Sequence, residues 1–301
     1  MPSTLRFGPP VITVDVEDWP ESSLDSNLPV TPRVVRNTAR ILGVLRQARV
    51  KATMFVLGKV VEAFPDLVRD IRTEGHEIAS HDYGHVPVFR RSQEEFRETL
   101  RRCKGQLEDL IGVQVRGYRA PDFSILRTNL WALDVLAELG FEYDSSIFPI
   151  KRPRYGIAGW PAYPVLVCLG SGAKLIECPI GTARLFGTRL PTGGGGYHRL
   201  LPGFLFRYLT KRTLVSRPFI FYCHPYESDP FEFRETDLNI PYFKRIHQGL
   251  GRGHFEAHFK LFLECFGGRR VCDLLSHPGS VHDELRLDEW CLTQPTCHSA
   301  A

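Results

Sequence analysis

Hydrophobic runs alternate with amphipathic stretches along the chain, and this alternation predicts a parallel sheet with crossover helices. Short apolar, β-branched runs are typical of buried strands, whereas apolar residues spaced three and four apart behind a capping residue indicate helices. We predict strands at 11–16, 52–57, 77–80, 115–118, 141–143, 175–180, 218–223 and 271–275. We predict helices at 32–45, 65–74, 92–111, 128–139, 201–213 and 256–266.

The pattern is less regular in the second half of the chain. Residues 151–201 are rich in Gly and Pro, and they contain a single predicted strand. No internal repeat is visible. We therefore expect an α/β chain that folds as one barrel-like domain over residues 1–301, with its core motifs at 11–225, a more specific part at 226–290 and an elaborated second half.

Composition narrows the choice of protein class only modestly. The 301 residues include 38 Lys and Arg and 34 Asp and Glu, which gives a net charge of +4. This charge is too small to argue for a nucleic-acid partner, and we expect the pairs Lys211–Arg212 and Arg269–Arg270 to be solvated. The hydrophobic fraction of 43% and the aromatic fraction of 11% are those of a globular protein.

We expect a cytoplasmic protein without a transmembrane segment. No stretch reaches the roughly 18 uninterrupted apolar residues that a membrane span needs, and residues 1–10 lack the pattern of a signal peptide. The eight cysteines form no CxxC pair, so we interpret them as reduced thiols. Cys291, Cys297 and His298 lie close together near the C-terminus, but without a fourth spaced ligand they make a poor metal site.

Unusual polar residues follow the predicted strands one after another. In parallel α/β folds ligands bind at the carboxyl ends of the strands, so this coincidence predicts an active site. The residues at these ends are Asp15, Glu17, Asp18, His81, His85, Arg119, Asp144 and His224.

The pair His81 and His85 is the best candidate for a metal site. Their spacing of four residues allows both imidazoles to face one ion, and Glu17 or Asp18 could complete a site of two histidines and one carboxylate with open positions for water. Asp15 and Glu17 are two apart and share a face of an extended strand, so one could bind the metal while the other acts as a base. The alternative is that these acids pair with surface arginines.

Arg119 and His224 are candidates for supporting and acid roles. A guanidinium fixed by the following Ala120–Pro121 can hold a carboxylate through two hydrogen bonds and keep it ionised, although a purely structural ion pair is equally compatible with the residue alone. His224 ends a strongly apolar run, and as an imidazolium it could protonate a leaving group. Taken alone, it is more typical of a satisfied core histidine.

These motifs, in this order, resemble the polysaccharide deacetylases of the NodB-homology type, carbohydrate esterase family 4. The matching stretches lie at 11–15, 80–85, 119–121 and 221–225. Residues 15–19, 143–146 and 194–202 resemble more narrowly the subgroup found beside bacterial exopolysaccharide and exosortase loci, and the similarity extends over roughly 10–290.

The resemblance implies a distorted β/α barrel with a divalent metal, most often Zn²⁺ and in some cases Co²⁺ or Ni²⁺. It implies Asp15 as the base, Arg119 as its orienting partner, His224 as the acid, and Asp144 as a residue that positions this histidine or lines the groove. His81 and His85 become metal ligands. The common first motif has two adjacent aspartates, but position 16 is Val here. The metal carboxylate must then be Glu17 or Asp18, and we prefer Glu17 because it shares the face of Asp15.

The leading hypothesis is a metal-dependent hydrolase that removes N-acetyl groups from amino sugars of a polysaccharide or its lipid-linked precursor, with an N-acetylated glycan as its partner. The alternatives are an allantoinase-like amidohydrolase that cleaves a C–N bond in a small molecule, and a carbohydrate-binding protein without activity. Trp160, Tyr163 and Tyr197 are candidates for substrate contacts, and each is as typical of packed core. We interpret 193–196 as a flexible loop, because it lacks the Lys-Ser/Thr of a phosphate-binding loop.

Overall fold

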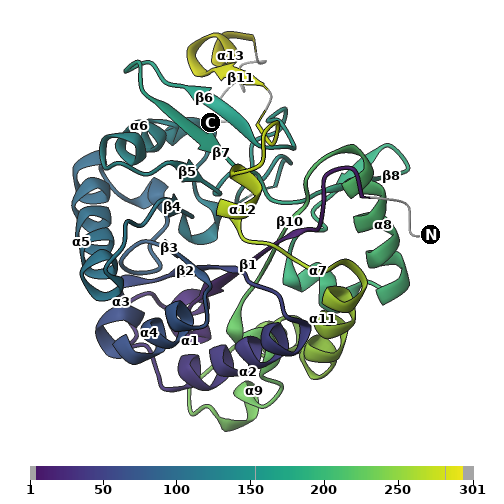
Figure 1. Ribbon diagram of the computed structural model, residues 1–301. Coiled ribbons are helices and arrows are strands. Elements are labelled where there is room, and N and C mark those ends of the chain that lie inside the picture. The colour runs from purple at the N-terminus through teal and green to yellow at the C-terminus, as the bar shows by residue number, and fades with distance from the viewer. Residues whose placement is uncertain (1–4, 153, 282, 294–301) are drawn as a thin grey trace.

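The computed structural model describes residues 5–152, 154–281 and 283–293, which form a curved central sheet surrounded by helices (Figure 1). The sheet has nine strands in the order β10-β1-β2-β3-β4-β5-β7-β6-β11. All neighbouring strands are parallel except β6 and β7. The strands are β1 Val11–Val16, β2 Thr53–Val56, β3 Glu77–Ser80, β4 Gly117–Tyr118, β5 Tyr143–Asp144, β6 Val165–Cys168, β7 Lys174–Glu177, β10 Ile220–Cys223 and β11 Glu284–Arg286.

The α-helices lie around this sheet, and a separate hairpin lies at one side (Figure 1). The hairpin pairs β8 Ala183–Leu185 with β9 Thr188–Leu190. The helices are α1 Trp19–Ser23, α2 Arg33–Ala48, α3 Gly58–Ala63, α4 Pro65–Thr73, α5 Gln93–Ile111, α6 Trp131–Glu138, α7 Gly195–Leu200, α8 Gly203–Ser216, α9 Glu232–Glu235, α10 Tyr242–Gly249, α11 Arg252–Phe266, α12 Val271–Leu275 and α13 Leu287–Thr293. This α/β architecture is the distorted barrel that the sequence predicts.

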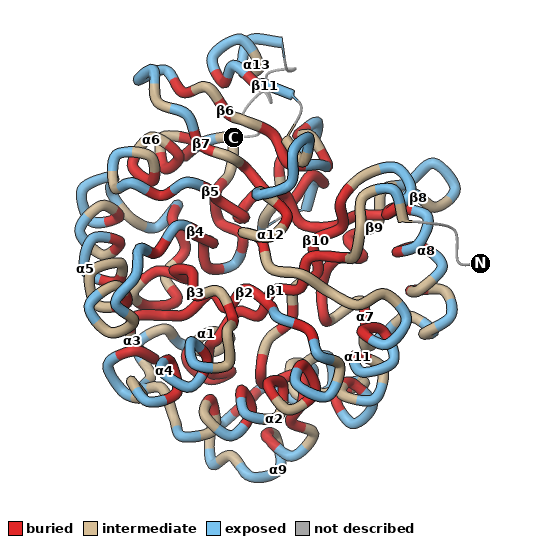
Figure 2. Tube along the Cα trace, viewed as in Figure 1, coloured by how far each residue is buried: buried red, intermediate tan, exposed pale blue. Residues whose placement is uncertain are grey.

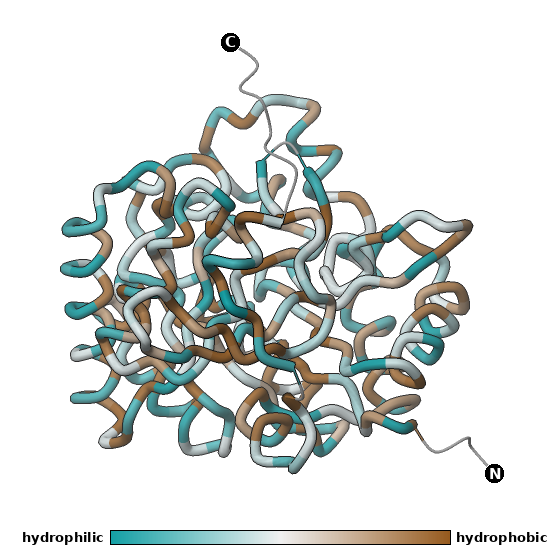
Figure 3. Tube along the Cα trace, turned by 90° about the horizontal axis from the view of Figure 1, so that it is seen from above, coloured by the Kyte–Doolittle hydropathy of each residue, from teal (hydrophilic) through white to brown (hydrophobic). Residues whose placement is uncertain are grey.

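The centre of the sheet is buried on both faces, which explains why its strands are continuous apolar runs (Figure 2). Every residue of β1 is buried. On the outer helices hydrophobic and hydrophilic residues alternate (Figure 3), and on α2 the apolar side chains face the core. Burial on one helix face and on both sheet faces therefore fixes the layers of the fold.

Local sequence signals place several helix ends as predicted. Ser92 caps α5 through a reciprocal capping box, in which the Glu95 backbone N–H donates to Ser92 Oγ and the Glu95 carboxylate accepts from the Ser92 backbone. Gly112 ends this helix with a φ of 68°, a conformation that glycine adopts without steric cost. Helix α2 begins one residue later than predicted, at Arg33.

Two predictions for the second half are wrong. Residues 271–275 form helix α12 and not a strand, because Asp273 accepts hydrogen bonds from the Arg270 backbone and guanidinium and so caps a helical turn. Residues 193–196 are not a flexible loop. Gly193 and Gly194 lie buried against β10, where the Tyr222 N–H donates to the Gly193 carbonyl.

Two other predictions concern membrane spans and cysteines. Among the described residues, no helix is both long and apolar enough to cross a membrane. The seven cysteines in the described part are free thiols, and Cys291 is exposed. Cys297 and His298 lie outside the described residues.

Candidate active site

Five of the eight predicted site residues line one cavity of about 400 Å³ at the carboxyl ends of the strands, namely Asp15, Glu17, His81, His85 and His224. Strand β1 places Asp15 and Glu17 there, and the segment after β3 adds His81 and His85. His224 follows β10, which pairs directly with β1. The juxtaposition of residues more than 200 positions apart thus follows from the strand order.

Glu17, His81 and His85 form a compact group of potential metal ligands. Their ligand atoms all lie within 4.8 Å of one another, and all three residues are buried. Glu17 Oε2 lies 3.1 Å from His81 Nε2 and 3.1 Å from His85 Nε2. Two imidazoles and one carboxylate around a common point are a donor set that suits Zn²⁺ and leaves positions open for water.

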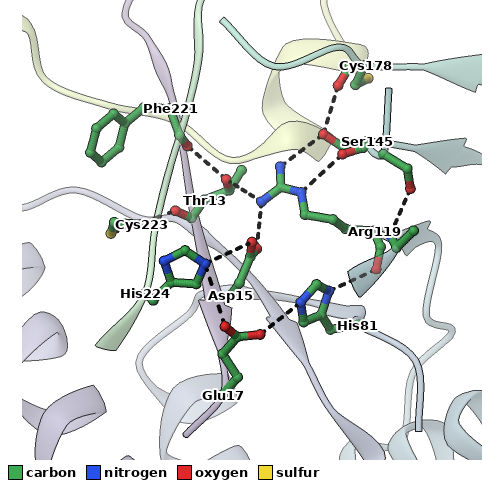
Figure 4. Close-up of polar contacts among 12 residues, drawn as sticks. Thr13, Asp15, Glu17, His81, Arg119, Ser145, Cys178, Phe221, Cys223 and His224 are labelled. Atoms are coloured by element: carbon green, nitrogen blue, oxygen red, sulfur yellow. Dashed lines mark hydrogen bonds and ion pairs between the residues drawn. The ribbon is translucent and has the colours of Figure 1, made fainter. Parts of the chain in front are cut away.

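Hydrogen bonding orients His81, and the nearby charges keep Glu17 ionised, so that this group can bind a cation. His81 Nδ1 lies 2.8 Å from the Arg119 carbonyl, an arrangement in which Nδ1–H donates to the carbonyl and Nε2 faces Glu17 (Figure 4). Burial alone would raise the pKa of Glu17, but the facing His85, His224 and His81 hold it well below its usual range. Burial alone would lower the pKa of His85, yet the Glu17 carboxylate raises it to about 9.

Asp18, the other candidate carboxylate, faces a different environment. Its Oδ2 accepts a hydrogen bond from the Thr31 backbone N–H at 2.7 Å, and burial raises the pKa of this carboxyl group. Asp18 precedes α1 rather than lying in β1, so its side chain supports the segment that leads to α2. Of the two, only Glu17 lies in the group with both histidines.

Asp15 is held by a buried guanidinium. Arg119 Nη1 donates to Asp15 Oδ1 at 2.6 Å and to Thr13 Oγ1 at 2.8 Å (Figure 4). The rest of the guanidinium donates to Ser145, through Nε to the carbonyl and through Nη2 to Oγ, and it lies 4.1 Å from the ring centre of Phe55. These contacts fix the position of the Arg119 side chain. An arginine at this position supplies both a positive charge beside Asp15 and several hydrogen-bond donors in a planar arrangement.

His224 faces both carboxylates from the end of the neighbouring strand, β10. Its Nε2 lies 3.6 Å from Glu17 Oε1 and 4.0 Å from Asp15 Oδ2, and its ring stacks on Tyr226 with 4.7 Å between centroids. Burial alone would lower the pKa of His224, but Glu17 and Glu227 raise it. The raised pKa favours the imidazolium form of His224 beside the two carboxylates.

Comparison with known proteins places the first half of the chain in a family. Residues 11–143 match the family model described as polysaccharide deacetylase. The chain carries a polysaccharide deacetylase domain. Residues 145–274 match a domain of unknown function (DUF3473). The central sheet combines strands from both segments, since β10, β7 and β6 come from the second.

Relatives of the deacetylase domain support this assignment. A peptidoglycan-N-acetylglucosamine deacetylase of Bacillus cereus is 37% identical over 98 residues, which are 32% of this chain and 36% of that protein. A chitooligosaccharide deacetylase of Rhizobium leguminosarum bv. trifolii is 32% identical over 109 residues, 32% of this chain and 51% of that protein. The match thus spans about a third to a half of each relative.

Solved structures share the fold over nearly the whole chain. A Mycobacterium smegmatis protein assigned as a polysaccharide deacetylase has a TM-score of 0.58 at 19% identity, with 97% of this chain and 91% of that chain covered. Puue allantoinase has a TM-score of 0.57 at 16% identity, with the same coverage. At these identities the likeness concerns the fold alone.

The second segment completes the site of the deacetylase domain with Glu227, a residue that the sequence analysis missed. Glu227 Oε1 lies 2.9 Å from His224 Nδ1, and Arg199 Nε donates to its other oxygen at 2.8 Å. Burial alone would raise the pKa of Glu227, but His224 and Arg199 lower it. A Cβ atom at Gly195 would clash with Glu227 Oε1, so a larger residue there would displace this carboxylate. The available signal was an acid three residues after His224, at the start of a helical turn that begins with Pro225.

Asp144 does not lie where we expected it. It neither lines the cavity nor contacts His224; it accepts a hydrogen bond from Ser146 Oγ and pairs in register with Glu177 of β7. Burial raises the pKa of Asp144 to about 6 and that of Glu177 well above its usual value. The carboxylate that contacts His224 is Glu227, so the structure does not place Asp144 in the position predicted for it.

The aromatic residues that line the cavity also differ from those predicted. Trp160 is buried against Trp290, and the Tyr197 hydroxyl accepts a hydrogen bond from Arg152. Tyr163 lies in a separate surface depression beside β11. The aromatic side chains at the cavity are Phe123, Tyr155, Tyr222 and Tyr226.

Proposed function

We propose that this protein is a metal-dependent hydrolase that removes N-acetyl groups from the amino sugars of a polysaccharide or its lipid-linked precursor. The observation that carries the proposal is the buried set of Glu17, His81 and His85 beside Asp15 on one side and His224 on the other. The named relatives, a peptidoglycan-N-acetylglucosamine deacetylase and a chitooligosaccharide deacetylase, supply the substrate class.

Glu17, His81 and His85 would hold a divalent metal, for which Zn²⁺ is the first choice and Co²⁺ and Ni²⁺ are alternatives. A bound metal of this kind lowers the pKa of its water and polarises a carbonyl oxygen. Successive side chains on a strand point to opposite sides, so Val16 points away from the cavity that Asp15 faces. Glu17, at the next position, faces the cavity and provides the carboxylate oxygen.

Asp15 would accept the proton of the attacking water. Arg119 orients this carboxylate through the 2.6 Å contact, which leaves Oδ2 directed toward His224 and the cavity. A base that is fixed in position before substrate binds loses little free energy to reorganisation when the reaction proceeds.

His224 would donate a proton to the leaving nitrogen. An amide nitrogen leaves poorly without a proton, and general acid catalysis of this kind contributes about 10²–10⁴-fold. Glu227 holds Nδ1–H, so Nε2–H faces the reacting centre, where Asp15 and Glu17 lie within 4.0 Å.

The test is acetate release from chitooligosaccharides and from peptidoglycan fragments by the full chain after loading with Zn²⁺, Co²⁺ or Ni²⁺. We expect turnover that Asp15→Asn abolishes and that Glu17→Gln lowers together with metal content. Asp18→Asn is the matched control, because Asp18 is an adjacent buried carboxylate outside the ligand group.

Other outcomes would support a different function. Hydrolysis of a cyclic ureide with no acetate release would favour the allantoinase-like alternative. Glycan binding without turnover under every metal would favour a binding protein.

A further inference from the structure

One part of the surface carries only positive charge. Residues 178–226 contain no Asp or Glu, although the chain as a whole is nearly balanced. Among the Lys and Arg side chains of this segment, all of which lie in the described residues, only Arg199 forms an ion pair with a carboxylate, that of Glu227. Its other basic residues are Arg184, Arg189, Arg207, Lys211, Arg212 and Arg217. The overall net charge of +4 conceals this local excess.

These basic residues are gathered on the β8–β9 hairpin and helix α8, which pack together. The Thr213 hydroxyl of α8 and the Arg217 guanidinium both donate to the Thr182 carbonyl just before β8. Arg184, Arg212 and Arg217 line one depression between the two elements. Burial and the neighbouring arginines lower the pKa of Arg217, as expected where cations lack a counter-charge.

Large apolar side chains are exposed among these cations. Phe186 is 98% exposed, Phe204 is 71% exposed, and Tyr208 and Val215 are each at least half exposed. We call the exposed residues Arg184, Phe186, Phe204, Tyr208, Lys211 and Arg212 the basic aromatic face. Figure 2 shows the hairpin and α8 together on one side of the molecule, with much of their trace exposed.

Phe186 has a strained backbone conformation. It occupies the tip of a two-residue hairpin loop between Leu185 and Thr188, with a φ of 47°, and Gly187 follows with a φ of 79°. Such turns favour Asn, Asp or Gly at the first position, and a bulky side chain there is strained. In the isolated chain this side chain buries almost no surface that could offset the strain of the turn. We therefore infer that Phe186 is buried when the protein contacts a binding partner.

We propose that the basic aromatic face binds the surface of a membrane that contains anionic lipids. Interfacial binding needs both components seen here, namely apolar side chains that enter the acyl boundary and Lys or Arg side chains that attract anionic headgroups. A nucleic-acid duplex or an acidic polymer without aromatic groups would use the cations but would leave the Phe186 tip in water. This proposal is independent of the deacetylase activity.

The test is co-sedimentation of the full chain with phosphatidylcholine vesicles that contain or lack 30% phosphatidylglycerol. We expect binding to the anionic vesicles only, and weaker binding at higher salt because each basic residue near an anionic surface contributes about fivefold. Lys211→Glu/Arg212→Glu is expected to lower the partition constant at least tenfold. Phe186→Ser is expected to lower it about tenfold, because the Phe side chain no longer enters the acyl region.

Matched variants separate this face from the rest of the surface. Lys51→Glu/Arg72→Glu makes the same change in charge elsewhere, and Leu292→Ser removes an apolar side chain that is 86% exposed on α13. Both are expected to bind as the wild type does. Absence of binding to anionic vesicles, or equal loss in these controls, would overturn the proposal. Binding that survives Phe186→Ser and is matched by heparin or DNA would also overturn it and would indicate a polyanion site.

Discussion

Replacement of Glu227 by Gln tests whether the second segment of the chain takes part in proton donation. Gln keeps the size of the side chain and can still accept a hydrogen bond from His224 Nδ1, but it removes the negative charge 2.9 Å away. The imidazolium form of His224 then loses its adjacent buried counter-charge, while Asp15 and the metal ligands keep their positions.

The expected effect follows from the energy of a hydrogen bond to a charged partner. Such bonds contribute about 1.5–3 kcal/mol, which corresponds to about 10- to 150-fold in rate. Because Gln retains an acceptor, we expect about a tenfold loss in kcat for Glu227→Gln and about a hundredfold loss for Glu227→Ala. The value of KM should change little, because Glu227 is buried behind His224 and does not line the cavity.

The assay compares two leaving groups on the same enzyme. Hydrolysis of an N-acetylated glycan needs a proton on the departing nitrogen, whereas a nitrophenyl acetate releases a stable anion without one. We therefore expect Glu227→Gln to slow glycan deacetylation about tenfold and nitrophenyl acetate hydrolysis less than about twofold.

Glu232→Gln is the matched control, because Glu232 is a buried acid on the same segment that pairs with Arg252 and not with His224. It should affect both substrates alike, through stability. Equal slowing of the two substrates by Glu227→Gln would refute the positioning role and leave Glu227 with a structural role only.

Three further results are expected. Dialysis against a chelator should remove activity, and Zn²⁺ should restore it except in His81→Ala. The proposed metal site would be contradicted if activity survived chelation and elemental analysis found no bound metal. Gly195→Ala should lower kcat because the added Cβ displaces Glu227. Gly196→Ala should not lower it, because the added Cβ there meets no atom closer than 3.9 Å. Equal kcat values in the two variants would argue against this steric explanation. Burial lowers the pKa of His198 to about 3, so its neutral form stabilises the fold above pH 6.5 and this contribution is lost as the pH falls. Between pH 7 and pH 5 we expect a loss of about 2 kcal/mol of unfolding free energy from this residue, and urea titrations of His198→Phe at both pH values should lack it.

The first half of the fold was predictable because its signals are local. The apolar run of β1, the capping box at Ser92 and the glycine after α5 each depend on residues within a few positions. The second half depends on distant contacts. Tyr222 holds Gly193 in place across the sheet, and Asp273 converts an apolar stretch into a helical turn. Neither effect is visible as hydrophobic periodicity.

The site residues also divide into those that local signals predict and those that depend on distant contacts. Asp15, Glu17 and Arg119 were predictable because each lies at the end of a strand. Asp15 and Glu17 line one cavity together with both imidazoles of the metal group, and Arg119 donates a hydrogen bond to Asp15. The preference for Glu17 over Asp18 followed from strand alternation alone. Glu227 escaped prediction, because its importance depends on the rotamer that brings it back to His224. Asp144 also ends a strand, but the register of β5 with β7 turns it toward Glu177.

The pairing of β1 with β10 has a consequence for biosynthesis. Thr13 and Phe221 are in contact across 208 residues of sequence, so one edge of β1 has no native partner until most of the chain has left the ribosome. At about 5–20 residues per second, this delay is about 10–40 s. During that interval the carboxylates at the end of β1 and the histidines after β3 can come together, but His224, the proposed proton donor, has not yet been synthesised. If the proposed site binds a metal, the nascent chain could acquire it before the proposed acid is in place, and the open strand edge is the point at which a chaperone would be needed.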